Sequence, residues 1–205
     1  MKYVIYILLT LFLLASCQKE EYVGTPRGMG TLVLETLSVQ TENVNTVFTR
    51  AVEPDLYVEI WQNGQLLTGQ RYEPGKVPGK LDLPAGVYLL KTYNQAYQDM
   101  SGWLDTEKGN MAFSAEKDFE IESNEINYLS VEVPMVNIGV SLKLPEGFSD
   151  RFKDYHFTVQ VGNRSVEISN GETAYFPLSE VTYILSATNN DGENKTKSKT
   201  IKSPV

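Results

Sequence analysis

The segment LDLPAGVYLLKTYN (residues 81–94) carries the clearest structural signal in the sequence. Two apolar runs meet at Pro84 and the glycine that soon follows it, and these residue types turn a chain sharply. The second run contains Tyr88 and is rich in aromatic and aliphatic side chains, as strands are. The segment AYFPLSEVTYILSATN (174–189) repeats the arrangement around Pro177. The sequence therefore predicts two proline corners, one in each segment, and each joins a pair of strands.

Short runs of the same character occupy most of the chain after residue 30. They read TLVLETLSV, LYVEIWQ, VYLLKTY, INYLSVEV, VNIGVSLKL, HFTVQV, RSVEIS, TAYFPL and TYILSAT, with Gly, Pro, Asn and Asp between them. This spacing is typical of an all-β sandwich. In LYVEIWQ, alternate residues from Leu56 to Ile60 share one face, and those from Tyr57 to Trp61 share the other. SDRFKDY (149–155) suggests a helical turn, and we predict an all-β fold around it.

The repeat divides the chain into two consecutive β-sandwiches. In each half a turn containing Gly and Asn precedes the proline corner. We place the first sandwich at residues 30–134 and the second at 135–205. The second is short, which leaves three alternatives: it is small, the sequence is clipped, or a final strand comes from elsewhere. A sandwich that lacks an edge strand exposes backbone amides with which another chain can pair.

Residues 1–16 have the features of a bacterial signal peptide. The apolar run 3–14 is too short to cross a bilayer, which takes roughly 20 helical residues. Leu-Ala-Ser-Cys at 14–17 resembles a lipobox, in which the cysteine receives a diacylglycerol and becomes the first mature residue. Two or more acyl chains anchor a protein stably. We therefore predict lipidation at Cys17, the alternative being a secreted protein with an incidental cysteine.

The residues after the cysteine are expected to form a flexible tether. Residues 17–29 carry charges, glycines and a proline without apolar periodicity. The acidic pair Glu20 and Glu21 resembles the export signal of surface lipoproteins in Bacteroidetes, which sends them to the outer leaflet. The alternative is a solvated linker.

Composition excludes several classes of function. The formal net charge of −8 argues against a nucleic-acid partner. One cysteine and one histidine leave almost no material for a zinc site and none for an internal disulfide. We expect neither a metal nor a cofactor.

Residues for catalysis are also lacking. His156 in YHFTVQV alternates out of phase with its apolar neighbours, so it should face away from the core, and no GxSxG motif supplies a nucleophile. NNDGEN (189–194) crowds oxygen ligands around a glycine, although a plain hairpin turn explains it more simply. Acidic residues on loops are usually solvated, but a glycosidase would need two across a cleft. The candidates for such a pair are Asp99, Asp105, Glu107, Glu116 and Asp118. We predict that the protein is not an enzyme.

The loop from Gln95 to Asn110 is the best candidate for recognition. It holds Tyr97 and Trp103 among small and acidic residues. Aromatic side chains on a loop can stack on sugars or anchor a protein partner. The alternative is that Trp103 folds back to cover the edge of the sandwich.

Longer stretches of the chain resemble a known family. They read GMGTLVLETLSV, TRAVEPDLYVEIW, LDLPAGVYLLKTYN, VNIGVSLKLPEGFSDRFKDYHFTVQVG and TAYFPLSEVTYILSATNNDG, and together they span residues 28–192. These stretches resemble the domain-of-unknown-function 4493 family of Bacteroides-type surface lipoproteins. That family is similar in organisation to lipid-anchored minor fimbrilins, which anchor or cap pili. The resemblance implies two transthyretin-like or immunoglobulin-like sandwiches and a structural or adhesive role.

Two positions bear on the comparison with pilins. The segment AYQDMSGWLDTEKG (96–109) departs from a Trp-x-x-Pro-Tyr pattern common in the family, so a shared ligand role is not implied. Arg50 in FTRAV stands where related pilins can be trimmed to free a groove for a donor strand. The alternative is an exposed arginine between strands.

These observations favour a cell-surface, lipid-anchored structural or adhesive protein of the outer membrane. In this interpretation it is a fimbrial-type anchor, tip or accessory component, with pilin-like subunits as partners. The alternative is a glycan-binding accessory lipoprotein of a polysaccharide-uptake system, in which Tyr97 and Trp103 contact the glycan.

Overall fold

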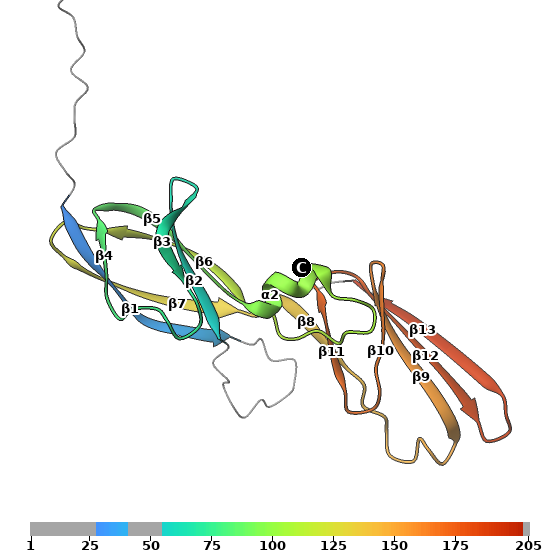
Figure 1. Cartoon of the computed structure of the whole chain (residues 1–205). Helices are drawn as coiled ribbons and strands as arrows, with labels where there is room; N and C mark the ends of the chain where they lie inside the picture. The colour runs from blue at the N-terminus through green and yellow to red at the C-terminus, as the bar shows by residue number, and fades with distance from the viewer. Residues whose placement is uncertain (1–27, 41–54, 203–205) are drawn as a thin grey trace, which may run out of the picture.

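A computed structural model describes residues 28–40 and 55–202, and Figure 1 shows them as two β-rich lobes that follow one another along the chain. Among the described residues, the N-terminal lobe contains seven strands in two sheets. Its strands are β1 (Met29–Gln40), β2 (Leu56–Gln62), β3 (Gln65–Tyr72), β4 (Leu81–Pro84), β5 (Gly86–Asn94), β6 (Ser114–Ile121) and β7 (Ile126–Pro134). The sheet orders are β4-β1-β7 and β3-β2-β5-β6. β1 and β7 are parallel, whereas the other neighbours are antiparallel.

The C-terminal lobe contains six strands among the described residues. They are β8 (Asn137–Ser141), β9 (Phe152–Val161), β10 (Arg164–Glu167), β11 (Thr173–Pro177), β12 (Val181–Asn189) and β13 (Asn194–Ile201). The sheet orders are β11-β8 and β10-β9-β12-β13, and all pairs are antiparallel.

Each lobe encloses its own hydrophobic core. The predicted alternation in β2 is confirmed, because Val58 and Ile60 are fully buried in the first core. The prediction of an all-β sandwich fold is confirmed as well. The limits placed at residues 30–134 and 135–205 stay predictions. Large side chains that are fully buried in the two cores are Leu32, Ile60, Tyr88, Leu90 and Ile121 in the first and Val159, Val166, Ile168 and Phe176 in the second.

Both proline corners carry the chain from one sheet to the other. β4 ends at Pro84 and β5 begins at Gly86, yet the two strands belong to different sheets. The Tyr88 hydroxyl donates to the Pro84 carbonyl at 2.6 Å and so fixes the first corner. After Pro177 the chain crosses in the same way from β11 to β12. The corner is therefore the step that closes each sandwich.

Two strands lack the apolar pattern by which the others were recognised. β6 (SAEKDFEI) is rich in charges, and β13 (NKTKSKTI) is exposed along its whole length. No clear apolar run follows residue 189 in the sequence, yet β13 forms there and pairs with β12 from Val181 to Thr188. A strand whose two faces are solvated needs no alternation of apolar and polar residues.

Helical structure lies at a different place from the one expected. The SDRFKDY segment forms a turn up to Arg151, where the Phe152 amide donates to the Phe148 carbonyl, and β9 then begins. A short helix, α2 (Gln95–Asp99), instead opens the loop expected at 95–110. Among residues 28–40 and 55–202, no helix is long and apolar enough to span a membrane. Met29, which was expected to belong to the tether, opens β1 opposite Pro84.

Candidate functional site at the junction of the two lobes

The segment between β5 and β6 reaches from the first lobe to the second. Asn94 caps α2, since its side-chain oxygen accepts from the Tyr97 amide at 3.1 Å. The same side chain accepts from the Phe113 amide at 3.0 Å and donates to the Met111 carbonyl at 2.7 Å. The Asn94 side chain thereby joins the two ends of the segment between β5 and β6. A 3₁₀ turn, η1 (Met100–Gly102), follows α2 and ends at Trp103.

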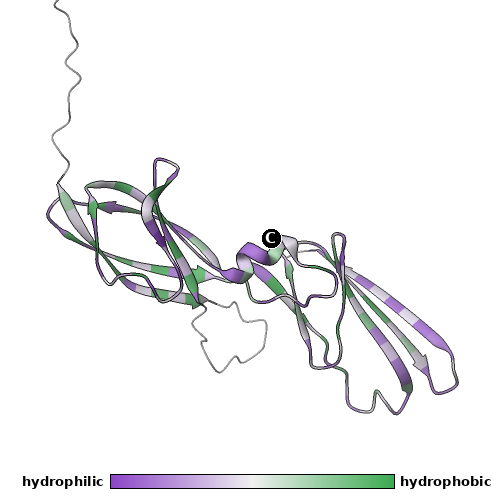
Figure 2. Cartoon of the chain, viewed as in Figure 1, coloured by the Kyte–Doolittle hydropathy of each residue, from purple (hydrophilic) through white to green (hydrophobic). Residues whose placement is uncertain are grey.

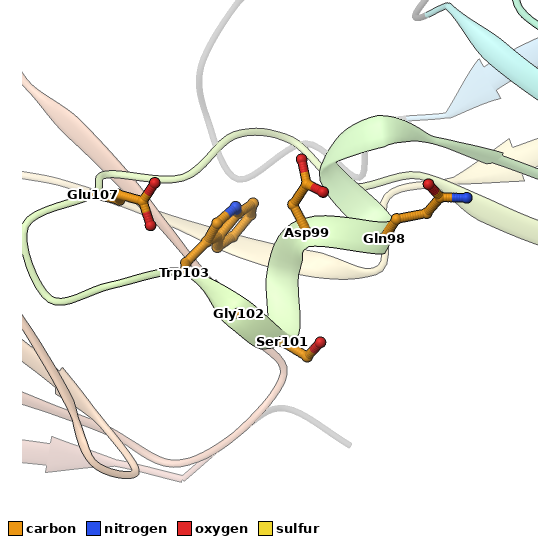
Figure 3. A pocket seen from close by; sticks show the side chains of 6 residues that line it. All are labelled: Gln98, Asp99, Ser101, Gly102, Trp103 and Glu107. Carbon is orange, nitrogen blue, oxygen red and sulfur yellow. The ribbon is translucent and has the colours of Figure 1, made fainter.

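A shallow pocket of about 370 Å³ lies on this segment. Figure 3 shows the Trp103 indole between the parts of the chain that carry Asp99 and Glu107. The two carboxylates already have hydrogen-bond partners. Asp99 accepts from the Gln95 side chain at 2.8 Å, and Glu107 accepts from the Leu104 amide at 2.5 Å. The lining residues are Gln98, Asp99, Ser101, Gly102, Trp103 and Glu107.

The Trp103 ring packs against the second lobe as well as against its own loop. The Arg164 guanidinium lies 5.4 Å from the ring centroid, within the range of a cation–π contact. Gly109 has a φ of +67°, and a Cβ there would come within 2.7 Å of the indole. The structure therefore agrees with the alternative that Trp103 folds back over the protein. Much of its ring is unavailable for stacking on a ligand.

Arg164 binds both lobes at once. Its Nε donates to the Leu104 carbonyl at 3.2 Å, its Nη1 donates to the Tyr175 carbonyl at 2.6 Å, and its Nη2 donates to the Glu107 carbonyl. The guanidinium also lies 4.7 Å from the centroid of the Phe176 ring. Burial lowers the pKa of Arg164, and the nearby carboxylates oppose that change. An arginine in a protein nevertheless keeps its charge, so these bonds are charge-assisted.

Main-chain bonds reinforce this contact. The Tyr175 amide in β11 donates to the Lys108 carbonyl at 2.6 Å, so the loop follows the outer edge of that strand. The Lys108 ammonium pairs with Glu172, and this hydrogen bond lowers the pKa of the Glu172 carboxyl. The Ser165 amide donates to Asp105 at 3.3 Å. The residues expected to form a recognition loop thus also connect the lobes.

The structure separates the two residues expected to contact a ligand. The Tyr97 side chain is 41% exposed and lies 6.0 Å from Tyr93, centroid to centroid. Trp103 lines the pocket beside the lobe junction, and Tyr97 does not. The predicted lipidation site Cys17, the export residues Glu20 and Glu21, and Arg50 lie outside the described residues. Their roles stay predictions.

The other candidate groups take part in local contacts. The His156 Nδ1 lies 2.7 Å from a Glu167 oxygen on the solvent side of the sheet, as its alternation predicts. Glu116 pairs with Lys91 at 2.7 Å. Asn189 and Glu193 close the β12–β13 hairpin through backbone and side-chain bonds. Within residues 28–40 and 55–202, no cluster of His, Cys, Asp and Glu could hold a metal ion.

A buried carboxylate on the outer face of the first lobe was missed from the sequence. Glu59 is 7% exposed and accepts from the Tyr93 hydroxyl at 2.6 Å and from the Trp61 indole nitrogen at 2.9 Å. The Arg71 Nε lies 3.4 Å from it, and Tyr57 stacks on Tyr93 at 5.5 Å. The only local signal was an acid between two aromatic residues in YVEIW. The partners on β3 and β5 depend on strand register.

This all-β chain with two lobes matches a known protein family. A family described as "Domain of unknown function (DUF4493)" matches residues 28–204. The chain belongs to this family, and the predicted membership is confirmed. Among curated proteins, none matches the chain.

Three solved structures show weaker similarity. A "putative adhesin" from Bacteroides ovatus is 12% identical, with 85% of this chain and 83% of that chain covered and a TM-score of 0.40. The TIE protein of Bacillus anthracis is 13% identical, with 86% and 31% covered and a TM-score of 0.32. BcpA, the major pilin subunit of Bacillus cereus, is 9% identical, with 86% and 68% covered and a TM-score of 0.25.

The contact between Glu59 and Tyr93 should make the stability of the fold decrease at alkaline pH. Burial, and then the bond to Glu59, raises the pKa of Tyr93 to about 12. An unfolded tyrosine loses its proton near pH 10. Between these values the folded chain holds more protons than the unfolded chain, so stability is complete below pH 10 and falls as the pH rises towards 12.

The variant Tyr93→Phe tests this dependence. We expect the free energy of unfolding of the unaltered chain to fall by about 1–2 kcal/mol more than that of the variant across this pH range. Urea unfolding at a series of alkaline pH values measures the difference. Tyr128→Phe is the control, because Tyr128 is 62% exposed. Parallel curves for the unaltered chain and Tyr93→Phe would contradict the assignment.

Proposed function

We propose that the protein is a lipid-anchored structural or adhesive protein of the bacterial cell surface. The observation that carries the proposal is the order of parts at the N-terminus: an apolar run, the lipobox residues up to Cys17, an acidic pair and a short polar tether. After this tether comes a fold built from β-sandwiches. This order suits a protein whose folded body is displayed just outside a membrane.

The more specific role that we propose is a fimbrial-type anchor, tip or accessory component. Two lobes in succession provide length away from the membrane, and the Arg164 contacts give that length stiffness. The two carboxylates that line the junction pocket, Asp99 and Glu107, accept hydrogen bonds from within the loop, which supports a mechanical role for it. In this proposal the partners are the outer membrane and pilin-like subunits.

The variant Cys17→Ser tests the anchor. We expect the unaltered chain to incorporate labelled palmitate and to fractionate with the outer membrane, because the acyl chains partition into lipid. The variant should incorporate no label and leave the membrane fraction. A double variant, Glu20→Ala with Glu21→Ala, is the matched control: it should keep the lipid but resist protease added to intact cells. An unmodified thiol at Cys17 in the mass of the mature protein would overturn the proposal.

A glycan-binding accessory role remains the second candidate. The exposed ring of Tyr97, which lies against the buried Tyr93 on the first lobe, favours it, because an exposed tyrosine offers a flat face to a sugar ring. Retention of the protein on polysaccharide columns separates the two roles. A glycan-binding protein is retained through Tyr97, whereas a structural subunit is not retained.

A further inference from the structure

The outer face of the sheet β3-β2-β5-β6 holds two buried polar side chains, Glu59 and Tyr93. The Tyr93 hydroxyl donates to Glu59 Oε1 at 2.6 Å, and the Trp61 indole nitrogen donates to Glu59 Oε2 at 2.9 Å. Burial of a carboxylate is costly unless donors surround it. Because both oxygens have donors, Glu59 is a fixed negative group just beneath the surface of the first lobe.

The fixed carboxylate holds one end of an exposed guanidinium. Arg71 on β3 pairs with Glu59 on β2, and its Nε lies 3.4 Å from the oxygen that Tyr93 contacts. A guanidinium carries five N–H donors in a planar fork. Within residues 28–40 and 55–202, Glu59 is the one hydrogen-bond or ion-pair partner of this guanidinium, and 53% of the Arg71 side chain is exposed. Its outer nitrogens are therefore available to a ligand.

The helix α2 brings an aromatic ring and an amide to the same place. The Tyr97 ring lies 6.0 Å from the Tyr93 ring, centroid to centroid, and the Gln98 side chain also interacts with Tyr93. Figure 2 shows α2 mostly in hydrophilic colours, and none of its residues is buried. Tyr93 thus has Tyr97 beside its ring and the Glu59–Arg71 pair at its hydroxyl. Three exposed side chains, Tyr97, Gln98 and Arg71, gather around it.

Arg71 is the cation of these strands that has donors to spare. The strands β2, β3 and β5 carry one other cation, Lys91. Its ammonium lies 2.7 Å from a Glu116 oxygen and 4.7 Å from the centroid of the Trp61 ring. The whole chain has a formal net charge of −8, so its overall field repels anions. Recognition of an anion on this face therefore depends on Arg71.

We propose that the face formed by Arg71, Tyr97 and Gln98 binds sugars that carry a carboxylate, such as the uronic acids of acidic polysaccharides. The guanidinium fork matches the two oxygens of a carboxylate. The Tyr97 ring offers a flat surface to the C–H groups of a sugar ring, and the Gln98 amide can donate to and accept from its hydroxyls. This inference rests on the glycan-binding candidate above and names its class of sugar.

Retention of the mature chain on immobilised acidic polysaccharides tests the proposal, with Ser at position 17 so that no lipid is present. The probes are polygalacturonate, alginate, hyaluronan and polysialic acid, each beside a matched polymer whose carboxylates have been reduced to alcohols. We expect retention on at least one acidic polymer and its loss on the reduced form, because an alcohol cannot accept the paired bonds of Arg71. Polyglutamate, which has the charge but no sugar ring, should not retain the chain.

Two sets of variants make the test specific. Arg71→Gln should weaken binding at least about tenfold through lost charge-assisted bonds, whereas Arg151→Gln, at an exposed turn of the second lobe, should not. Arg71→Lys keeps a positive charge beside Glu59 but lacks the planar fork, so it should stay folded and still bind more weakly. Tyr97→Ala should weaken binding, whereas Tyr97→Phe keeps the flat ring and should bind normally. Urea unfolding shows whether each variant remains folded.

Two results would overturn the proposal. They are the absence of retention on every acidic polymer and equal retention of the unaltered chain and Arg71→Gln. Equal retention on the reduced polymers, lost in Tyr97→Ala, would keep the glycan-binding candidate and contradict the requirement for an acidic sugar. The assay contains no membrane, so its failure is distinct from failure of the proposed anchor, which Cys17→Ser tests in cells.

Discussion

The Arg164 guanidinium is the contact on which the relation between the two lobes depends. It donates to carbonyls of Leu104 and Glu107 on the loop from the first lobe and of Tyr175 on β11 of the second. Its faces meet Trp103 and Phe176. Because the planar group is fixed by several acceptors at once, rotation of the two lobes would leave a partly buried charge without its acceptors.

The Arg164 contact fixes the second lobe against the loop that comes from the first lobe. In the first lobe β1 lies between β4 and β7, whereas in the second lobe β11 is the one described strand that pairs with β8. The loop that carries Trp103 follows the opposite edge, that of β11, through the Lys108–Tyr175 bond. One edge of the small sheet is thus used to hold the lobes together.

Most of the fold could be predicted from the sequence, because its signals are local. The corner at Pro84 and the alternation from Leu56 to Ile60 depend on neighbouring residues, and both are found. β13 could not be recognised, since a strand without a covered face has no apolar period. The contacts of Glu59 depend on strand register. The contacts of Arg164 with the loop join residues about 60 positions apart along the chain. Sequence reasoning therefore identified the loop but left open which way Trp103 turns.

The distance between the lobes is the most direct test of the Arg164 contact. Spin labels at Lys76→Cys and Lys153→Cys, both exposed, report it in a mature chain that carries Ser at position 17. With Arg164 present, electron resonance should give one narrow distance distribution. With Arg164→Ala it should give a broad one, while Arg151→Ala, which lies in a turn, should leave it narrow. An equally narrow distribution in Arg164→Ala would show that the lobes are held together by something else.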